Sequence, residues 1–189
     1  MGRPAKFEPA AAVGKAVDVF WRQGYGATSP QGLADQLGIG KGSLYNTFES
    51  KRNLFSLALG AYTARRAAEL AGMLEGPGPV RPRLRAVVEE MTGAGEHRRG
   101  CLVVNAIAEL ADADESVPAA GNALFDRMEE AFRAAVTAGR STGELTGPQP
   151  PGDAASSLLA TVVGTSVLVR AGGTTPRVRR IIDAAVDAL

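Results

Sequence analysis

Apolar residues recur at intervals of three and four along nearly the whole chain, the spacing that places them on one face of a helix. The clearest example lies near the C-terminus, where Val178, Ile181, Ile182, Ala185 and Val186 follow this spacing. No segment shows a clear strand pattern of alternating apolar and polar residues. The pattern therefore predicts an all-α fold of about nine helices.

Glycine, proline and capping residues divide this pattern into segments. The sequence predicts a first helix that ends near Gly24, a short second helix that begins at Thr28, a third over about 41–47, and a longer fourth over about 51–74 that Ser50 caps. Thr28 and Gln31 have the spacing of a capping box. Further helices are predicted over about 81–92 and 101–111, from Pro118 onward, over about 153–170, and from Thr175.

The 189 residues carry a net charge of only +1, but the charge is unevenly distributed. Residues 1–52 contain seven Lys or Arg against four Asp or Glu, giving +3, whereas residues 53–189 contain 14 against 16, giving −2. Eight of the ten aromatic residues lie before residue 63. These compositions predict two parts, a basic head over 1–52 and a larger aliphatic body over 53–189.

The residues available for chemistry exclude several classes of protein. The chain has one cysteine, Cys101, and one histidine, His97, so we expect no intramolecular disulfide, no metal site and no cofactor. No Ser-His-Asp set and no glycine-rich phosphate loop after a strand is found, so we do not expect an enzyme. The absence of a run of about 18 apolar residues and of a signal-peptide core predicts a cytoplasmic protein that does not contact a membrane.

Residues 28–48 have the pattern of a helix-turn-helix, because two short helices flank the tight turn Gly38-Ile39-Gly40. Leu44 and Phe48 are predicted to point into a core. The other face of the second helix carries hydrogen-bonding or small residues, namely Lys41, Gly42, Ser43, Tyr45, Asn46 and Thr47. Such residues suit base edges and phosphates in a major groove, and a helix N-terminus left open by glycines suits a phosphate. This segment is therefore predicted to bind DNA.

A longer stretch resembles a known family. Residues 27–51, with Leu44-Tyr45 followed by Phe48 and then Ser50-Lys51, resemble the DNA-binding head of bacterial TetR/AcrR-family transcriptional regulators, and residues 16–25 resemble the first helix of that family. The resemblance implies an all-helical homodimer whose head binds double-stranded operator DNA and whose body binds a small effector. Most members repress transcription and leave the DNA when the effector binds.

The resemblance also implies roles for particular residues. Tyr45 and Lys51 correspond to phosphate contacts, and Thr28 is expected to cap the second helix and to touch phosphate. Lys41, Gly42, Ser43 and Asn46 are the further candidates for DNA contact. Arg52 is expected to add positive charge near the phosphates, and Trp21 to pack inside the head.

Two further sets of candidates lie in the body. The predicted lining of the effector pocket is Met91, Cys101, Leu102, Asn105, Phe125, Met128 and Phe132. The last two helices are expected to form the dimer interface through Val162, Val163, Ser166, Val167, Val178, Ile181, Ile182 and Ala185. Glu109 is a candidate to receive a cationic ligand or to pair with an arginine.

Alternative functions stay open at this point. Cys101 at a helix start, near Arg98 and Arg99, could be a reactive thiol that senses oxidants or electrophiles, or simply a small buried residue. An architectural DNA-binding protein without an effector is a second alternative, although a body of 137 residues is not needed to wrap DNA. The sequence names neither the operator, the regulated genes nor the effector, and activation remains an alternative to repression.

Overall fold

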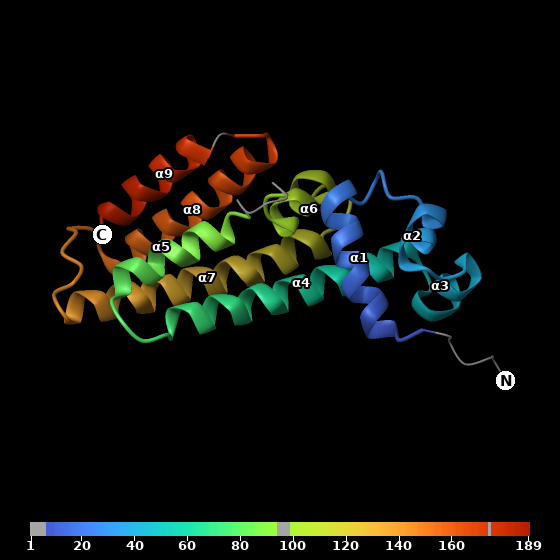
Figure 1. The fold of residues 1–189 in the computed structure, drawn as a ribbon, viewed down its shortest axis with the longest axis horizontal. Coiled ribbons are helices and arrows are strands. Elements are labelled where there is room, and N and C mark those ends of the chain that lie inside the picture. The colour runs from blue at the N-terminus through green and yellow to red at the C-terminus, as the bar shows by residue number, and fades with distance from the viewer. Residues whose placement is uncertain (1–6, 94–98, 174) are drawn as a thin grey trace.

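A computed structural model of the chain describes residues 7–93, 99–173 and 175–189. Within these residues the fold is all-α, which confirms the predicted class, and no strand occurs among them. The helices are α1 (Pro9–Gln23), α2 (Pro30–Leu37), α3 (Lys41–Phe48), α4 (Lys51–Leu74), α5 (Val80–Met91), α6 (Leu102–Leu110), α7 (Ser116–Ser141), α8 (Pro151–Arg170) and α9 (Thr175–Asp187). Figure 1 shows α1–α3 gathered at one end of an elongated molecule, with α5, α8 and α9 toward the other.

Local capping explains where the helices of the head begin. Ser29, not the predicted Thr28, caps α2, because its hydroxyl oxygen accepts a hydrogen bond from the Gly32 N–H at 3.0 Å. The prediction for Ser50 is confirmed, since its hydroxyl accepts from the Asn53 N–H at 3.0 Å and α4 follows directly. These two caps set the positions of the helices on either side of α3.

Two body helices, α7 and α8, begin slightly earlier than predicted. α7 starts at Ser116 rather than Pro118, because the Asp114 carboxylate accepts hydrogen bonds from both the backbone N–H and the hydroxyl of Ser116. α8 starts at Pro151, where proline has no N–H to leave unpaired in the first turn. At both starts, a polar residue or a proline outside the apolar pattern therefore coincides with the beginning of the helix.

The head packs around the aromatic residues of α1 and α4. Phe20 and Phe55 are buried and meet edge to face, with ring centroids 5.1 Å apart. Leu33 from α2 and Leu44 from α3 are fully buried in the same cluster, at roughly 1.5–3 kcal/mol of stabilisation for each side chain. This core holds the two short helices, which are too short to be stable alone.

Residues of α1 and α6 join the head to the body. Trp21 does not pack inside the head as predicted, because its indole N–H donates to the Gly100 carbonyl at 3.1 Å and its ring meets Tyr62 edge to face. The Glu109 carboxylate accepts from the backbone N–H groups of Tyr25, at 2.9 Å, and Gly26, at 2.6 Å. Glu109 therefore holds the α1–α2 turn instead of pairing with an arginine.

The body packs α7 against α4, α5, α6 and α8, with α9 resting on α5 and α8 (Figure 1). Its core is mostly aliphatic: Leu84, Leu124, Leu158 and Ile182 are nearly inaccessible, as is Phe132. Among the described helices only α8 is long and apolar enough to span a bilayer. In this structure α8 instead packs its buried face on α7 and α9, as a core helix of a globular body does.

Candidate nucleic-acid interface and ligand cavities

The tight turn between α2 and α3 depends on Gly38. This residue has φ 71° in the left-handed region, where glycine has no Cβ penalty. The next residue donates its N–H to the Ala34 carbonyl at 3.0 Å, which closes the end of α2. The turn fixes the direction of α3 relative to α2, as a helix-turn-helix requires.

The structure gives α3 the two faces that the sequence predicts. Leu44 and Phe48 are buried, while the residues on the other face are exposed, apart from Thr47, which was predicted to be exposed and is half-buried. Tyr45 is 38% exposed and does not pack under the helix. The exposed set is Lys41, Gly42, Ser43, Tyr45 and Asn46.

The first turn of α3 is open at its N-terminus. Gly40 occupies the capping position and forms no side-chain cap hydrogen bond with any part of the chain that the structure describes. A Cβ added at Gly42 would meet nothing within 4 Å. Packing within the free chain therefore does not require glycine at position 42. The N–H groups of this turn are accessible to an anion.

Thr28 and Lys51 lie together beneath the α1–α2 turn. Thr28 is fully buried and its hydroxyl donates to the Gly24 carbonyl at 2.6 Å, so its side chain does not face solvent. The Lys51 ammonium donates to the carbonyls of Tyr25 and Thr28, each at 3.0 Å, and lies 4.0 Å from the centroid of the Tyr25 ring. Lys51 therefore anchors the turn in the unbound head.

Arg52 points toward the body. Its guanidinium forms an ion pair with Asp114 at 2.9 Å, although the arginine side chain is 62% exposed. This pair and the Ser116 hydrogen bonds hold the pKa of the Asp114 carboxyl below its ordinary value, the Ser116 contact being the larger cause. The expectation that Arg52 adds charge along the DNA path is not supported by this placement.

The predicted effector pocket is a narrow cavity between α4, α5, α6, α7 and α8. Met91, Cys101, Phe125 and Met128 line it together with Arg66, Val104, Leu124, Val162 and Val163. Leu102, Asn105 and Phe132 do not: Asn105 donates to the Arg99 carbonyl, and the other two are buried in the core. Its free volume is about 10 Å³, room for about one water molecule.

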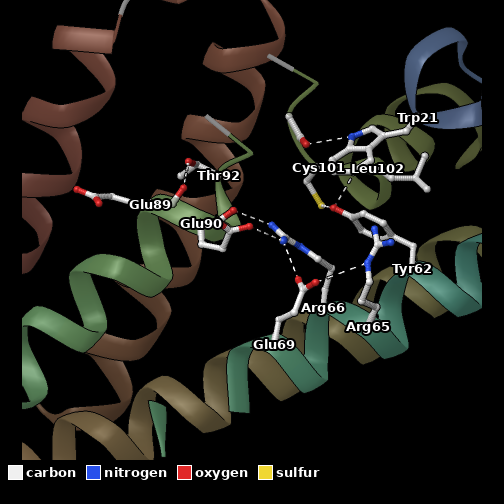
Figure 2. Close-up of polar contacts among 11 residues, drawn as sticks. Trp21, Tyr62, Arg65, Arg66, Glu69, Glu89, Glu90, Thr92, Cys101 and Leu102 are labelled. Atoms are coloured by element: carbon white, nitrogen blue, oxygen red, sulfur yellow. Dashed lines mark hydrogen bonds and ion pairs between the residues drawn. The ribbon is translucent and has the colours of Figure 1, made fainter. Parts of the chain in front are cut away.

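A polar network centred on buried Arg66 borders this cavity and was not predicted from the sequence (Figure 2). Arg66, only 6% exposed, donates to the carboxylates of Glu69 at 2.9 Å and Glu90 at 3.2 Å, and to the Glu90 carbonyl at 2.7 Å. An arginine in a helix of mixed polarity gives no sequence signal of burial, since arginine is rarely found inside. The network links the middle of α4 to the end of α5.

Cys101 lies beside Tyr62 in the same region. The Tyr62 hydroxyl donates to the Cys101 sulfur at 3.5 Å and accepts from the Leu102 N–H at 3.3 Å. Burial, followed by the neighbouring Cys101, raises the pKa of Tyr62 well above its ordinary value, so the phenol remains neutral. The thiol itself is buried, and Arg99 instead pairs with Asp18 at 3.0 Å. Arg98 and His97 lie outside the described residues.

A second, larger cleft was not predicted. It has a volume of about 460 Å³ and lies between the end of α4, α5, the end of α8 and α9, with a mixed polar and apolar lining. The lining is Met73, Ala86, Glu89, Glu90, Val169, Gly173, Thr175, Val178, Arg179 and Ile182. Its charged residues lie on the polar faces of α5 and α9. In the sequence these faces have the pattern of ordinary solvent-exposed helix faces.

The predicted dimer residues divide into two groups. Val162, Ser166, Val178 and Ile182 are buried against their own chain, so they offer no surface to a second copy. Val163, Val167, Ile181 and Ala185 remain at least partly accessible, and Val167 is 50% exposed. The predicted interface therefore combines residues of the core side of both helices with residues that a second copy could reach.

The chain combines a helix-turn-helix, whose recognition helix is exposed and polar, with an α-helical body that contains cavities. A long helix joins the two parts. This combination is that of a helix-turn-helix transcriptional regulator. Family models support this class: "Bacterial regulatory proteins, tetR family" matches residues 13–58, and "Tetracyclin repressor-like, C-terminal domain" matches residues 75–185. The chain belongs to the TetR family of transcriptional regulators.

Individual relatives agree with this membership. The chain is 32% identical over 150 residues to the HTH-type transcriptional regulator YezE of Bacillus subtilis, a match that covers 78% of this chain and 77% of YezE. It is 37% identical over 100 residues to the HTH-type transcriptional repressor BdcR of Escherichia coli, covering 53% and 51%. A solved structure of the TetR-family regulator CifR, a cysteine mutant complexed with 26-bp operator DNA, matches with a TM-score of 0.81, 26% identity and 99% coverage of both chains.

Proposed function

We propose that this protein is a one-component repressor that binds double-stranded operator DNA as a homodimer in the cytoplasm and is released by a small-molecule effector. Three relationships support the proposal: membership of the TetR family, the similarity to BdcR, which is named a repressor, and the similarity to CifR, which has been solved on operator DNA.

The observation that carries the DNA-binding part is the exposed face of α3. Lys41, Ser43, Tyr45 and Asn46 present donors or acceptors on one side of a helix whose other side is buried. We assign Lys41, Tyr45 and the open first turn to phosphates, and Asn46 to a base edge, where an amide pairs with adenine. Lys51 contributes by holding the turn and by its charge, whereas buried Thr28 is left out of the contact set.

Salt dependence tests this assignment. A phosphate contact releases counterions, so Lys41→Ala should lower the slope of log affinity against log salt by about two, because a dimer carries the change twice. Arg127 on α7 is exposed and far along the chain from the head, so Arg127→Ala is the matched loss of charge and should leave the slope unchanged. Equal slopes for Lys41→Ala and the wild type, on a site selected from random DNA, would place the interface elsewhere.

For the homodimer we propose the outward faces of α8 and α9. Ala160, Gly164 and Val167 share the accessible side of α8, and Ile181 and Ala184 share that of α9. Val167→Glu adds a charge where the free chain has room, so the monomer should fold while the dimer dissociates, since a charge would be buried unpaired. Light scattering measures the mass, and an unchanged dimer would refute this interface.

Release by an effector needs a connection from the body to the head. α4 spans about 36 Å from Lys51 to Leu74 at 1.5 Å per residue. The Glu109 and Trp21 contacts join α6 and the segment before it to α1 and the α1–α2 turn. A small tilt of α4 would change the spacing of the two heads, which must match half-sites about 34 Å apart. A coupling of about 3 kcal/mol would shift DNA affinity roughly 150-fold. An architectural protein would show no such release.

A further inference from the structure

The 460 Å³ cleft has the size of a small-molecule site, since ligand pockets in proteins span roughly 300–1,000 Å³. The narrow cavity around Met128 and Phe125, at about 10 Å³, has no room for an organic molecule without movement. A further hollow beside α7 and Gly152, at about 220 Å³, lies below that range. Of these three spaces, the cleft between α5 and α9 is the one with room for a small molecule in this conformation.

The two sides of this cleft have opposite electrostatic character. On one side, α5 ends at Met91, and Glu89 and Glu90 stand in its last turn, where the helix dipole is negative. That turn contains no basic residue, although Arg66 from α4 engages Glu90. On the other side, α9 begins at Thr175, so the positive end of its dipole and Arg179 border the cleft. A cation is favoured at the α5 side and an anion at the α9 side.

The two opposite charges do not neutralise each other. Among the described residues, neither the Glu89 nor the Arg179 side chain has an oppositely charged group within 4.0 Å. Figure 2 shows Glu89 pointing away from Arg66, whereas Glu90 points toward it and is engaged by it. Glu89 and Arg179 therefore stay available to a bound molecule.

Apolar side chains complete the cleft between these charges. Met73 from α4, Val169 from α8, and Val178 and Ile182 from α9 line it. Methionine adapts its shape to varied apolar groups. The lining thus combines a carboxylate, a guanidinium and an aliphatic surface, the complement of an ammonium, a carboxylate and an apolar side chain in one molecule.

We infer that this cleft is the effector site and that it takes an apolar zwitterion of the amino-acid type, with its ammonium at Glu89 and its carboxylate at Arg179 and the start of α9. The inference rests on the proposed function for the link to DNA release. Occupation would reach α4 through Glu90, which lines the cleft and binds the buried Arg66. The side of α9 that lines the cleft is the side that faces α5, as the ion pair of Asp183 with Arg85 of α5 also shows. The cleft therefore lies apart from the proposed dimer face at Ile181 and Ala184.

Direct binding to the full-length protein tests the site without DNA. The probes are L-phenylalanine, L-leucine and L-tryptophan, measured by calorimetry, with two analogues of phenylalanine: 3-phenylpropanoate, which lacks the ammonium, and 2-phenylethylamine, which lacks the carboxylate. At least one amino acid should bind below 10 mM, on the order of weak fragment affinity. Each phenylalanine analogue should bind at least about tenfold more weakly than phenylalanine, since each loses a charge-assisted hydrogen bond.

Variants assign each charge to its partner. Glu89→Gln should weaken phenylalanine about tenfold but leave 3-phenylpropanoate unchanged, and Arg179→Gln should weaken phenylalanine but leave 2-phenylethylamine unchanged. Ala86 is exposed and lines the cleft, so Ala86→Trp should fold, fill the space and abolish binding. Arg127→Gln, remote from the cleft, is the control and should bind as the wild type does.

The outcomes separate the two proposals. Three results would overturn the cleft assignment even if the protein represses. They are no binding of any amino acid at 10 mM, analogues that bind as tightly as phenylalanine, and binding that survives Ala86→Trp. A bound amino acid that leaves the operator complex intact overturns the effector role of the cleft. Failure of the wild type to bind any selected DNA overturns the proposed function, and calorimetry still decides whether the cleft takes a zwitterion.

Discussion

Replacing Gly42 by alanine separates what the fold needs from what DNA needs. Gly42 lies in the first turn of α3, and a Cβ at this position meets nothing within 4 Å in the free chain. Its φ is not in the left-handed region, so alanine adopts the same backbone without strain. The added methyl group therefore stands on the open face of α3, where we place the phosphates.

The magnitudes follow from this geometry. Glycine inside a helix costs roughly 0.5–1 kcal/mol relative to alanine, so Gly42→Ala should stabilise the free protein by about that amount. For a chain of this size the melting temperature should rise by about 1–4 °C. A methyl group forced into a tight contact costs about 1–3 kcal/mol, and the dimer carries it twice, so operator affinity should fall by at least about 30-fold.

Gly60→Ala is the matched control. Gly60 lies in the middle of α4, is exposed, and a Cβ there also meets nothing within 4 Å. The control should raise the melting temperature similarly and leave operator affinity unchanged. Differential scanning fluorimetry and fluorescence anisotropy on one labelled operator measure both quantities. If Gly42→Ala binds the operator as tightly as Gly60→Ala does, no part of the DNA closely approaches the start of α3, and the proposed docking is wrong.

Three further predictions concern the body and its connection to the head. Glu144 accepts hydrogen bonds at 2.7 Å from the first two N–H groups of α5, which lower the pKa of its carboxyl below the ordinary value. Its contribution to stability is complete above the ordinary pKa of a glutamate and is lost as pH falls through the lowered one. Glu144→Gln should therefore reduce stability at pH 7 and match the wild type in acid denaturation well below pH 4. Glu109→Ala should speed hydrogen exchange at the Tyr25 and Gly26 amides, and unchanged exchange would show that this junction is not maintained in solution. Cys101→Ala should cost about 1–3 kcal/mol by removing an acceptor from buried Tyr62 while repression and release persist; loss of release at unchanged stability would instead support thiol sensing.

Sequence alone determined the helices of this protein, because their signals are local. The apolar spacing and the Ser50 cap predicted α4 at Lys51–Leu74, the bounds that the structure has. The same reasoning predicted that Leu44 and Phe48 are buried and that the opposite face of α3 is exposed. Each of these properties depends on residues a few positions apart, which the chain itself places together.

Tertiary structure decided which residues can meet a partner. Thr28 could have capped α2, contacted DNA or been buried, and the packing of Lys51 and the α1–α2 turn decided between these roles. Thr28 is buried, and its neighbour Ser29 caps α2. The side of α8 that faces the core could not be told from the side that faces outward, because both carry small or apolar residues. Glu89 and Arg179 border one cleft although 90 positions separate them, because α9 packs on α5. Helical periodicity acts over a few residues, whereas a site depends on packing between helices far apart in the chain.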